Sequence, residues 1–321
     1  MLSLHRIVGR SWAIRGEIAD LVQRSYRQDG ITEIRALAGL RGQVYGRAKS
    51  GRQVGGSVAV VPILGMLTQR GDLVNSAETV STTAVGDDIR DLAADESVSA
   101  IVLEMDSPGG EVYGVPEAAA RVRGARASKP VLAVANSLAA SAMYWIGSQA
   151  DELIVTPSGE VGSIGVFALH EDVSEALAAE GVKVTLISAG KYKTEGNPYE
   201  PLTDEARATT QQGVDRFYDM FVRDVAKGRR VEISVVRDGF GEGRVVGARE
   251  AVRLGMADGI GTLEDGIRRA VAMAQDRRSP RAAVDVPIVV AAAPAESPAA
   301  YGEVQRRRHE LWGIDNPIHK V

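Results

Sequence analysis

Two serines follow an apolar run at residues 136–144, which read NSLAASAMY. We expect a strand to end near Asn136 and a helix to begin among the small residues from about Ala140. A serine near the N-terminus of a helix lies at the positive end of the helix dipole, where an alkoxide and a developing oxyanion are both favoured. Either serine could instead cap the helix, which is a common role for this residue. Ser137 is the better cap candidate, and this leaves Ser141 without an obvious structural role.

A glycine pair lies directly after another apolar run, in residues 106–110 with the sequence DSPGG. Adjacent glycines let the backbone approach a ligand closely and turn its N–H groups into a cavity. N–H groups arranged in this way can hold an oxyanion. Gly109 and Gly110 are therefore candidate oxyanion donors, although a simple turn between a strand and a helix would use the same residues.

A serine nucleophile needs a general base, because its hydroxyl is unreactive near neutral pH. Three of the four histidines lie in the terminal segments, and the fourth follows a predicted strand with no acid–serine motif around it: His5, His309, His319 and His170. There is also no G-x-S-x-G motif. A lysine can replace histidine where burial disfavours its charged form.

Two lysines lie in the loop at residues 188–198, which reads SAGKYKTEGNP. Lys191 and Lys193 are both candidate bases, and each could equally be a solvated surface residue. A second glycine-rich bend, GEVGSIG at residues 159–165, contains Ser163. This serine could be a turn residue or a hydrogen-bond partner.

The composition argues against several classes of function. The 321 residues contain no cysteine, which excludes disulfides, thiolate catalysis and cysteine-ligated metals. A net charge of −4 gives no reason to expect nucleic acid as a partner. The longest apolar stretch near the N-terminus, residues 58–67, is about half as long as a membrane-spanning helix. We therefore expect a cytoplasmic location with no membrane contact.

Apolar runs alternate with helical patterns from residue 57 onwards. Strands are expected at residues 58–67, 100–105, 131–135, 153–156, 165–168 and 182–188. Helices are expected at residues 87–94, 115–125, 140–148, 172–179, 204–226, 248–254 and 264–274. This alternation, with continuous apolar strands, predicts an α/β fold with a mostly parallel sheet covered by helices.

The flanking segments differ from this central region in composition. Residues 1–55 are rich in Lys and Arg, and we interpret them as a basic N-terminal arm and linker with an amphipathic helix around residues 18–26. Residues 56–277 form the predicted main domain. Residues 278–321 are rich in Ala and Pro and predict a C-terminal tail.

In their order along the chain, the segments DSPGG, AASAMY, GSIGV and SAGKYKTEGNPY resemble the signal peptide peptidase SppA family of serine peptidases. The resemblance covers roughly residues 57–275 and implies a ClpP/crotonase-like fold. Residues 190–202, GKYKTEGNPYEPL, are most similar to the phage branch of lambda-type head maturation proteases, which process scaffold or capsid components. The chain shows neither the transmembrane anchor nor the duplicated second half of other members. This favours a soluble, assembly-linked protease in the host cytoplasm or the assembling capsid.

By position, the resemblance implies a Ser–Lys dyad with Ser141 as the nucleophile and Lys193 as the general base. Lys191 is the less suitable lysine, since the family lysine directly precedes the segment that reads TEGNP here. The resemblance also implies that Ser163 forms a hydrogen bond to the lysine and orients it. The domain at residues 56–277 would then be the peptidase domain.

The resemblance further implies an oxyanion hole formed by backbone N–H groups near Gly109, Gly110 and Ala142. Such an enzyme uses no metal and no organic cofactor. Its partners would be a peptide or protein substrate, further copies of the chain in a homo-oligomer, and phage scaffold, portal or capsid proteins.

Three other functions remain open. A signal-peptide-peptidase-like protease of bacterial protein quality control would use the same chemistry on other substrates. An acyl-CoA enzyme of the same fold would need a catalytic acid near the glycine pair and a nucleotide site, and neither is evident in the sequence. A non-catalytic assembly module would keep the fold alone.

Overall fold

The computed structural model describes residues 11–14, 57–71, 79–277 and 288–289. Short strands from both flanking segments, β1 (Ser11–Ile14) and β13 (Ile288–Val289), pair with the sheets of the central region. The division into arm, main domain and tail stays a prediction. The helix expected around residues 18–26 lies outside the described residues.

The main sheet is built around three long parallel strands, β2 (Ser57–Leu64), β5 (Val98–Ser107) and β7 (Val131–Ala140). Shorter strands extend it beyond β7: β8 (Glu152–Val155), β9 (Glu160–Gly162), β11 (Val245–Gly247) and β12 (Gly259–Ile260). The pairs of β7 with β8 and with β9 are parallel, and β11 is antiparallel to β9. A mostly parallel sheet is therefore confirmed.

A second, smaller sheet has the order β10-β1-β6-β3-β4. Its other members are β10 (Phe167–Ala168), β6 (Gly109–Glu111), β3 (Met66–Thr68) and β4 (Thr79–Ser81). The single strand expected at residues 58–67 is divided between the two sheets at Gly65, whose φ of 105° suits glycine. The predicted strand boundary was wrong there because an apolar run does not show where the backbone turns from one sheet to another.

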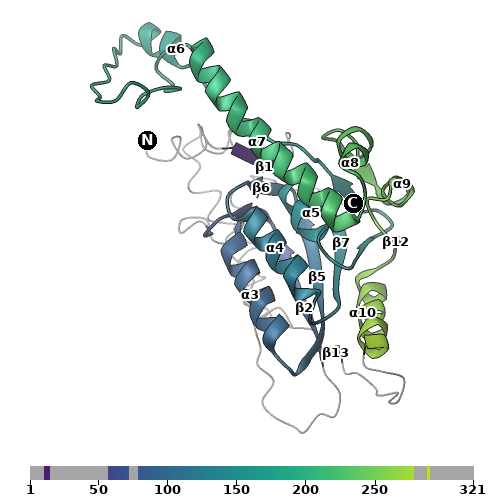
Figure 1. Cartoon of the computed structure of the whole chain (residues 1–321). Coiled ribbons are helices and arrows are strands. Elements are labelled where there is room, and N and C mark those ends of the chain that lie inside the picture. Colours follow the sequence, from purple (N-terminus) through teal and green to yellow (C-terminus); the bar gives the residue numbers. More distant parts are fainter. Residues whose placement is uncertain (1–10, 15–56, 72–78, 278–287, 290–321) are drawn as a thin grey trace, which may run out of the picture.

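Helices cover both faces of the main sheet (Figure 1). One face packs against α3 (Thr82–Ala94), α4 (Val115–Ala125), α5 (Ala142–Gly147) and α7 (Asp204–Arg229). The opposite face packs against α10 (Leu263–Arg277). Neighbouring strand residues such as Leu132 and Ala133 alternate between the two faces, and both are fully buried. Burial on both faces explains why these strands have continuous apolar sequences, and the α/β class is confirmed.

Three short helices complete the described chain: α6 (Ser174–Ala179), α8 (Ile233–Gly239) and α9 (Ala248–Leu254). The helices expected at residues 115–125 and 248–254 have the predicted bounds. Helix α8 and strands β4, β6, β9, β11 and β12 were not predicted. They are short, and their sequences have too few residues to show a periodicity.

The strand expected at residues 182–188 is absent, so this prediction was wrong. The segment has the apolar sequence of a strand. Its side chains are not buried, however: Val182, Val184, Leu186 and Ile187 are exposed, Ile187 to 96%. The segment projects from the main domain together with α6, at the end of α7 that is remote from α5 (Figure 1). No neighbouring strand in the described chain pairs with it, which explains why a strand-like sequence forms no strand here.

Candidate active site

Ser141 lies at the junction where β7 ends and α5 begins. It occupies the N-cap position of α5 with φ 55° and ψ −119°, a strained conformation for a residue other than glycine. Its backbone N–H donates to the carbonyl of Gly162 at 2.7 Å. The side chain is 1% exposed, and its Oγ has no hydrogen-bond partner within the described chain. A buried hydroxyl without a partner costs stability, so a role other than packing explains its presence.

The expected positions of the two serines need a correction. The strand does not end at Asn136 but continues to Ala140, so Ser137 lies exposed within β7 and does not cap the helix. Ser141 takes the cap position instead and makes no side-chain cap bond. Pairing with β9 extends β7 through the small residues 138–140, and this pairing is not visible in the local sequence.

Helix α5 is held firmly, although it is only six residues long. Its residues are all fully buried. Trp145 stacks on Phe221 of α7 at 4.5 Å between ring centroids, and its indole N–H donates to Asp224 at 2.8 Å. The turn that carries Ser141 is therefore fixed by contacts one turn further along the helix.

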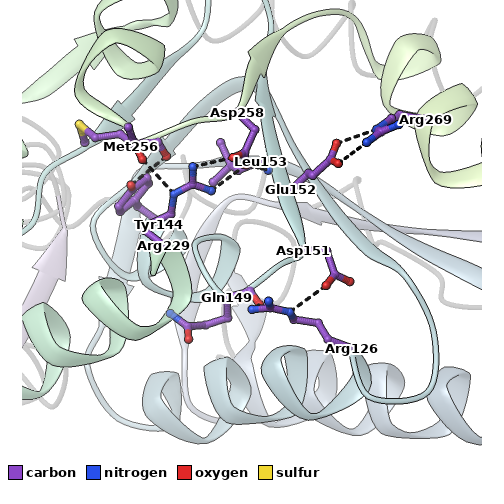
Figure 2. A network of polar contacts seen from close by, with 11 residues as sticks. Arg126, Tyr144, Gln149, Asp151, Glu152, Leu153, Arg229, Met256, Asp258 and Arg269 are labelled. Atoms are coloured by element: carbon purple, nitrogen blue, oxygen red, sulfur yellow. Dashed lines mark hydrogen bonds and ion pairs between the residues drawn. The ribbon is translucent and has the colours of Figure 1, made fainter. Parts of the chain in front are cut away.

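A polar network behind α5 adds to this support (Figure 2). The Tyr144 hydroxyl donates to the carbonyl of Met256 at 3.0 Å. Arg229 donates to the carbonyl of Gly255 and forms a bidentate pair with Asp258 at 2.7 and 2.9 Å. Burial raises the pKa of Tyr144 far above its ordinary value, so its hydroxyl stays a hydrogen-bond donor.

The glycine pair lies on β6, on a neighbouring part of the fold. Gly109 has φ 99°, and its N–H donates to Ser107 Oγ at 3.2 Å. A Cβ on Gly110 would lie 1.9 Å from the carbonyl oxygen of Leu67, so only glycine fits between β6 and β3. Ser107 is not among the predicted site residues. Its side chain accepts the Gly109 N–H only because the chain turns between these two residues.

Strand register brings the glycines and Ser163 to the level of Ser141. Ser107 pairs with Ala139, so Gly109 and Ser141 each follow by two residues on neighbouring chain segments. Ala140, the residue before Ser141, pairs with Gly162. Ser163 comes directly after Gly162, so it lies level with Ser141. Ser163 also has a positive φ, 56°, and is 9% exposed. The structure thus brings four of the expected positions together, with Ala142 beside them as the first residue of α5.

Lys193 is not brought to this cluster within the chain. It lies exposed in a turn at residues 191–196 between α6 and α7. Lys191 ties this turn to the first turn of α7 through an ion pair with Glu205 at 3.2 Å. At a rise of 1.5 Å per residue, Glu205 is about 24 Å along α7 from Phe221, the residue that contacts α5.

The other candidate bases contact groups elsewhere in the chain. Hydrogen bonds to Tyr192 and Glu205 raise the pKa of Lys191, which favours the charged ammonium form. His170 Nε2 lies 3.0 Å from the carbonyl of Asn197. Among the described residues, no cluster of three or more His, Asp or Glu side chains could hold a metal ion. The same part of the chain contains no helix long and apolar enough to cross a membrane.

Residues 123–276 match the family model described as Peptidase family S49. The capsid assembly protease C of Escherichia phage lambda is 34% identical over 74% of this chain and 55% of its own length. The head-tail preconnector protein GP5 of Enterobacteria phage P21 is 32% identical over 65% of this chain and 42% of its own length. The chain thus spans about half the length of these curated relatives.

The solved structure of the 1510-N membrane-bound stomatin-specific protease S97A mutant is also similar. It is 13% identical, with a TM-score of 0.47, over 75% of this chain and 99% of that chain.

Proposed function

We propose that this chain, whose residues 123–276 match the model of peptidase family S49, is a serine endopeptidase. The observation that carries the proposal is the state of Ser141: strained, 1% exposed, and with an Oγ that no group of the described chain contacts by a hydrogen bond. Strain of this kind, at about 1–3 kcal/mol, persists in native proteins mainly at functional sites. The glycine turn and Ser163 at the same level supply the surroundings that acyl transfer needs.

The proposed reaction uses Ser141 as the nucleophile. Its Oγ attacks the carbonyl carbon of a peptide bond, and Lys193 takes the hydroxyl proton as the general base. Backbone N–H groups near Gly109, Gly110 and Ala142 stabilise the oxyanion of the tetrahedral intermediate. The lysine returns the proton to the leaving amine, and water then hydrolyses the acyl-enzyme and regenerates the serine.

We place Lys193 of one subunit in the site of another. Two features support this arrangement. The lysine turn lies at the far end of α7 from the chain's own Ser141, and the segment just before it exposes the apolar side chains of Leu186 and Ile187. A neighbouring copy that covers these side chains would bring the lysine turn to its own surface. In this arrangement Ser163 of the receiving copy orients the incoming ammonium or amine.

Labelling by a fluorophosphonate tests the nucleophile directly. We expect a single adduct on Ser141, identified by peptide mass spectrometry, and its loss in Ser141→Ala. Ser137→Ala is the matched control, since Ser137 is exposed on the same strand and should leave labelling unchanged. Labelling that survives in Ser141→Ala would refute the nucleophile assignment.

Mixing two inactive variants tests where the lysine comes from. Ser141→Ala and Lys193→Ala should each lose peptide cleavage. An equal mixture, dissociated and reassembled, should regain about a quarter of the wild-type activity if serine and lysine come from different subunits. A mixture that stays inactive, although the variants assemble together, would show that each site uses its own lysine.

For the biological role, we propose the processing of phage scaffold or capsid proteins during head assembly, in the host cytoplasm or the assembling capsid. The support is the similarity to the lambda capsid assembly protease and to the P21 head-tail protein. Co-expression with candidate scaffold and major capsid proteins from the genome that carries this gene should give shortened products. These products should be absent when Ser141 is replaced by Ala.

A further inference from the structure

Strand β1 (Ser11–Ile14) lies between two strands that border the candidate site. It is antiparallel to β6, with Trp12 opposite Glu111, Ala13 opposite Gly110 and Ile14 opposite Gly109. It is also antiparallel to β10, with Ser11 opposite Ala168 and Trp12 opposite Phe167. Figure 1 shows this short strand beside β6. The N-terminal segment thus joins two strands that otherwise do not touch.

The register directs the C-terminal end of β1 towards the nucleophile. Ile14 faces Gly109, and Gly109 lies level with Ser141 because Ser107 pairs with Ala139. Along β1, Ile14 is therefore the residue nearest the Ser141 turn. A backbone in this register passes along the amides that we assign to the oxyanion hole.

Without β1, its two neighbours would present open edges to each other. In the described part of the chain β10 pairs with no other strand, and β6 keeps only β3. Both strands run antiparallel to β1, so they are parallel to each other and accept an extended chain of one direction. Such a slot binds peptides by main-chain hydrogen bonds on both sides and is largely independent of sequence. β1 fills it as a peptide substrate would.

We propose that Ser11–Ile14 occupies the peptide groove and competes with protein substrates, so that the N-terminal segment restrains the enzyme. The restraint of activity rests on the proposed protease function. The position of Ser11–Ile14 between β6 and β10 does not. The competing segment belongs to the same chain as the site, so it competes with a substrate as an intramolecular ligand. A substrate must displace it before Ser141 can react.

Hydrogen exchange in the full-length Ser141→Ala chain tests the occupancy without relying on catalysis. Trp12 pairs on both sides, so a proline there removes an N–H that points to one of the two neighbours. In Trp12→Pro we expect those amides of residues 110–111 and 167–168 that face β1 to exchange at least about tenfold faster. Trp12→Ala, which keeps the backbone N–H at the same position, is the matched control and should leave these amides protected. A synthetic peptide of residues 8–17 should restore protection to Trp12→Pro, and a scrambled peptide should not.

Kinetics with active Ser141 test the competition. With an unstructured protein substrate, Trp12→Pro should lower KM by about tenfold and leave kcat unchanged, because only a competing segment is removed. The 8–17 peptide should raise KM again, and cleavage of the chain itself next to residues 11–14 would equally place them in the groove. Equal exchange rates in Trp12→Pro and its parent would overturn the proposal. If no variant cleaves any substrate, the protease function fails, while the exchange experiment still decides the occupancy.

Discussion

Ser141 and Ser163 both have a positive φ, 55° and 56°. A positive φ costs a serine free energy that glycine would not lose. At Ser141 the strain accompanies a buried hydroxyl with no partner in the described chain, so two separate costs fall on one residue. Both are explained if the turn presents Oγ to a substrate carbonyl, with Gly109 on one side and Ser163 on the other.

Gly110 is the residue whose substitution should most directly damage the oxyanion turn. In Gly110→Ala the new methyl group would collide with the Leu67 backbone, and β6 would have to move away from β3. We expect a loss of stability of about 2–4 kcal/mol, comparable to overpacking of a rigid site, and an inactive enzyme. Chemical denaturation measures the change.

Gly124→Ala is the matched control for this glycine. Gly124 lies within α4, and nothing lies within 4 Å of the position of a new Cβ. A helical Gly→Ala change should stabilise the protein by about 0.5–1 kcal/mol. A Gly110→Ala protein as stable as the Gly124→Ala protein would show that β3 and β6 are not packed as described.

At the scale of elements, the site depends on helices that contribute no reacting group. α5 carries Ser141 and is anchored through Trp145 to α7 and through Tyr144 to the loop after α9. Arg229, the last residue of α7, connects the same loop to the end of α7 through Asp258. The position of the nucleophile is thus set by packing at the other end of a short helix.

Arg229→Ala should destabilise the protein. The Arg229 side chain is only 7% exposed, and its removal leaves the carboxylate of Asp258 without its bidentate partner. We expect a loss of about 2–3 kcal/mol in the free energy of unfolding, at the lower end for buried pairs because Asp258 is partly solvated. Urea denaturation measures it. Arg253→Ala removes an exposed i,i+3 ion pair and should cost about 0.5 kcal/mol or less.

The Asp258 pair should also make stability depend on pH. Burial alone would raise the pKa of Asp258, but the hydrogen bonds and charge of Arg229 outweigh it, and the pKa lies below its ordinary value. A carboxyl with a lowered folded-state pKa contributes stability above its unfolded pKa of about 3.9 and loses it as the pH falls through the folded value.

The difference in stability between the wild type and Asp258→Asn should therefore be constant from about pH 5 to 7 and shrink below about pH 4. Urea denaturation at several pH values measures this difference. A difference that grows on acidification would mean that burial, and not Arg229, dominates the titration of this carboxyl.

At the scale of the whole molecule, the projecting end is the part that a single chain leaves incomplete. Val182, Val184, Leu186 and Ile187 expose apolar side chains next to the lysine turn. Val182, Val184 and Leu186 alternate with Lys183 and Thr185, as in a strand that has one face to bury, and Ile187 adds a further exposed apolar side chain directly after them. A partner copy would cover this face and deliver Lys193 in the same contact.

Ile187→Ser should weaken self-association and activity together. Ile187 is 96% exposed in the single chain, so the change should not lower the stability of the fold. If the segment lies in a subunit interface, loss of this side chain should raise the dissociation constant of the oligomer by about tenfold or more. Sedimentation over a range of concentrations measures it. Lys183→Ser, on the same exposed segment, should have little effect, and equal assembly of both variants would exclude this segment from the interface.

The sequence by itself determined most of the elements and the neighbourhood of the nucleophile. The apolar runs of β5 and β7 and the helical periods of α4, α7 and α9 are local patterns, and they correspond to the structure within a few residues. The choice of Ser141, the glycine pair and Ser163 as neighbours also came from motif order along the chain.

Only the tertiary structure decided how these segments meet. The extension of β7 up to Ser141 depends on its pairing with β9, and the need for glycine at position 110 depends on the backbone of Leu67. The insertion of β1 between β6 and β10 joins residues that are about a hundred positions apart in the chain. The position of Lys193 also came from the tertiary structure, because a motif along the chain does not show that this lysine lies at the far end of α7 from Ser141. Local periodicity records which face of an element is buried, whereas pairing between distant segments depends on the shape of the surfaces that folding and assembly create.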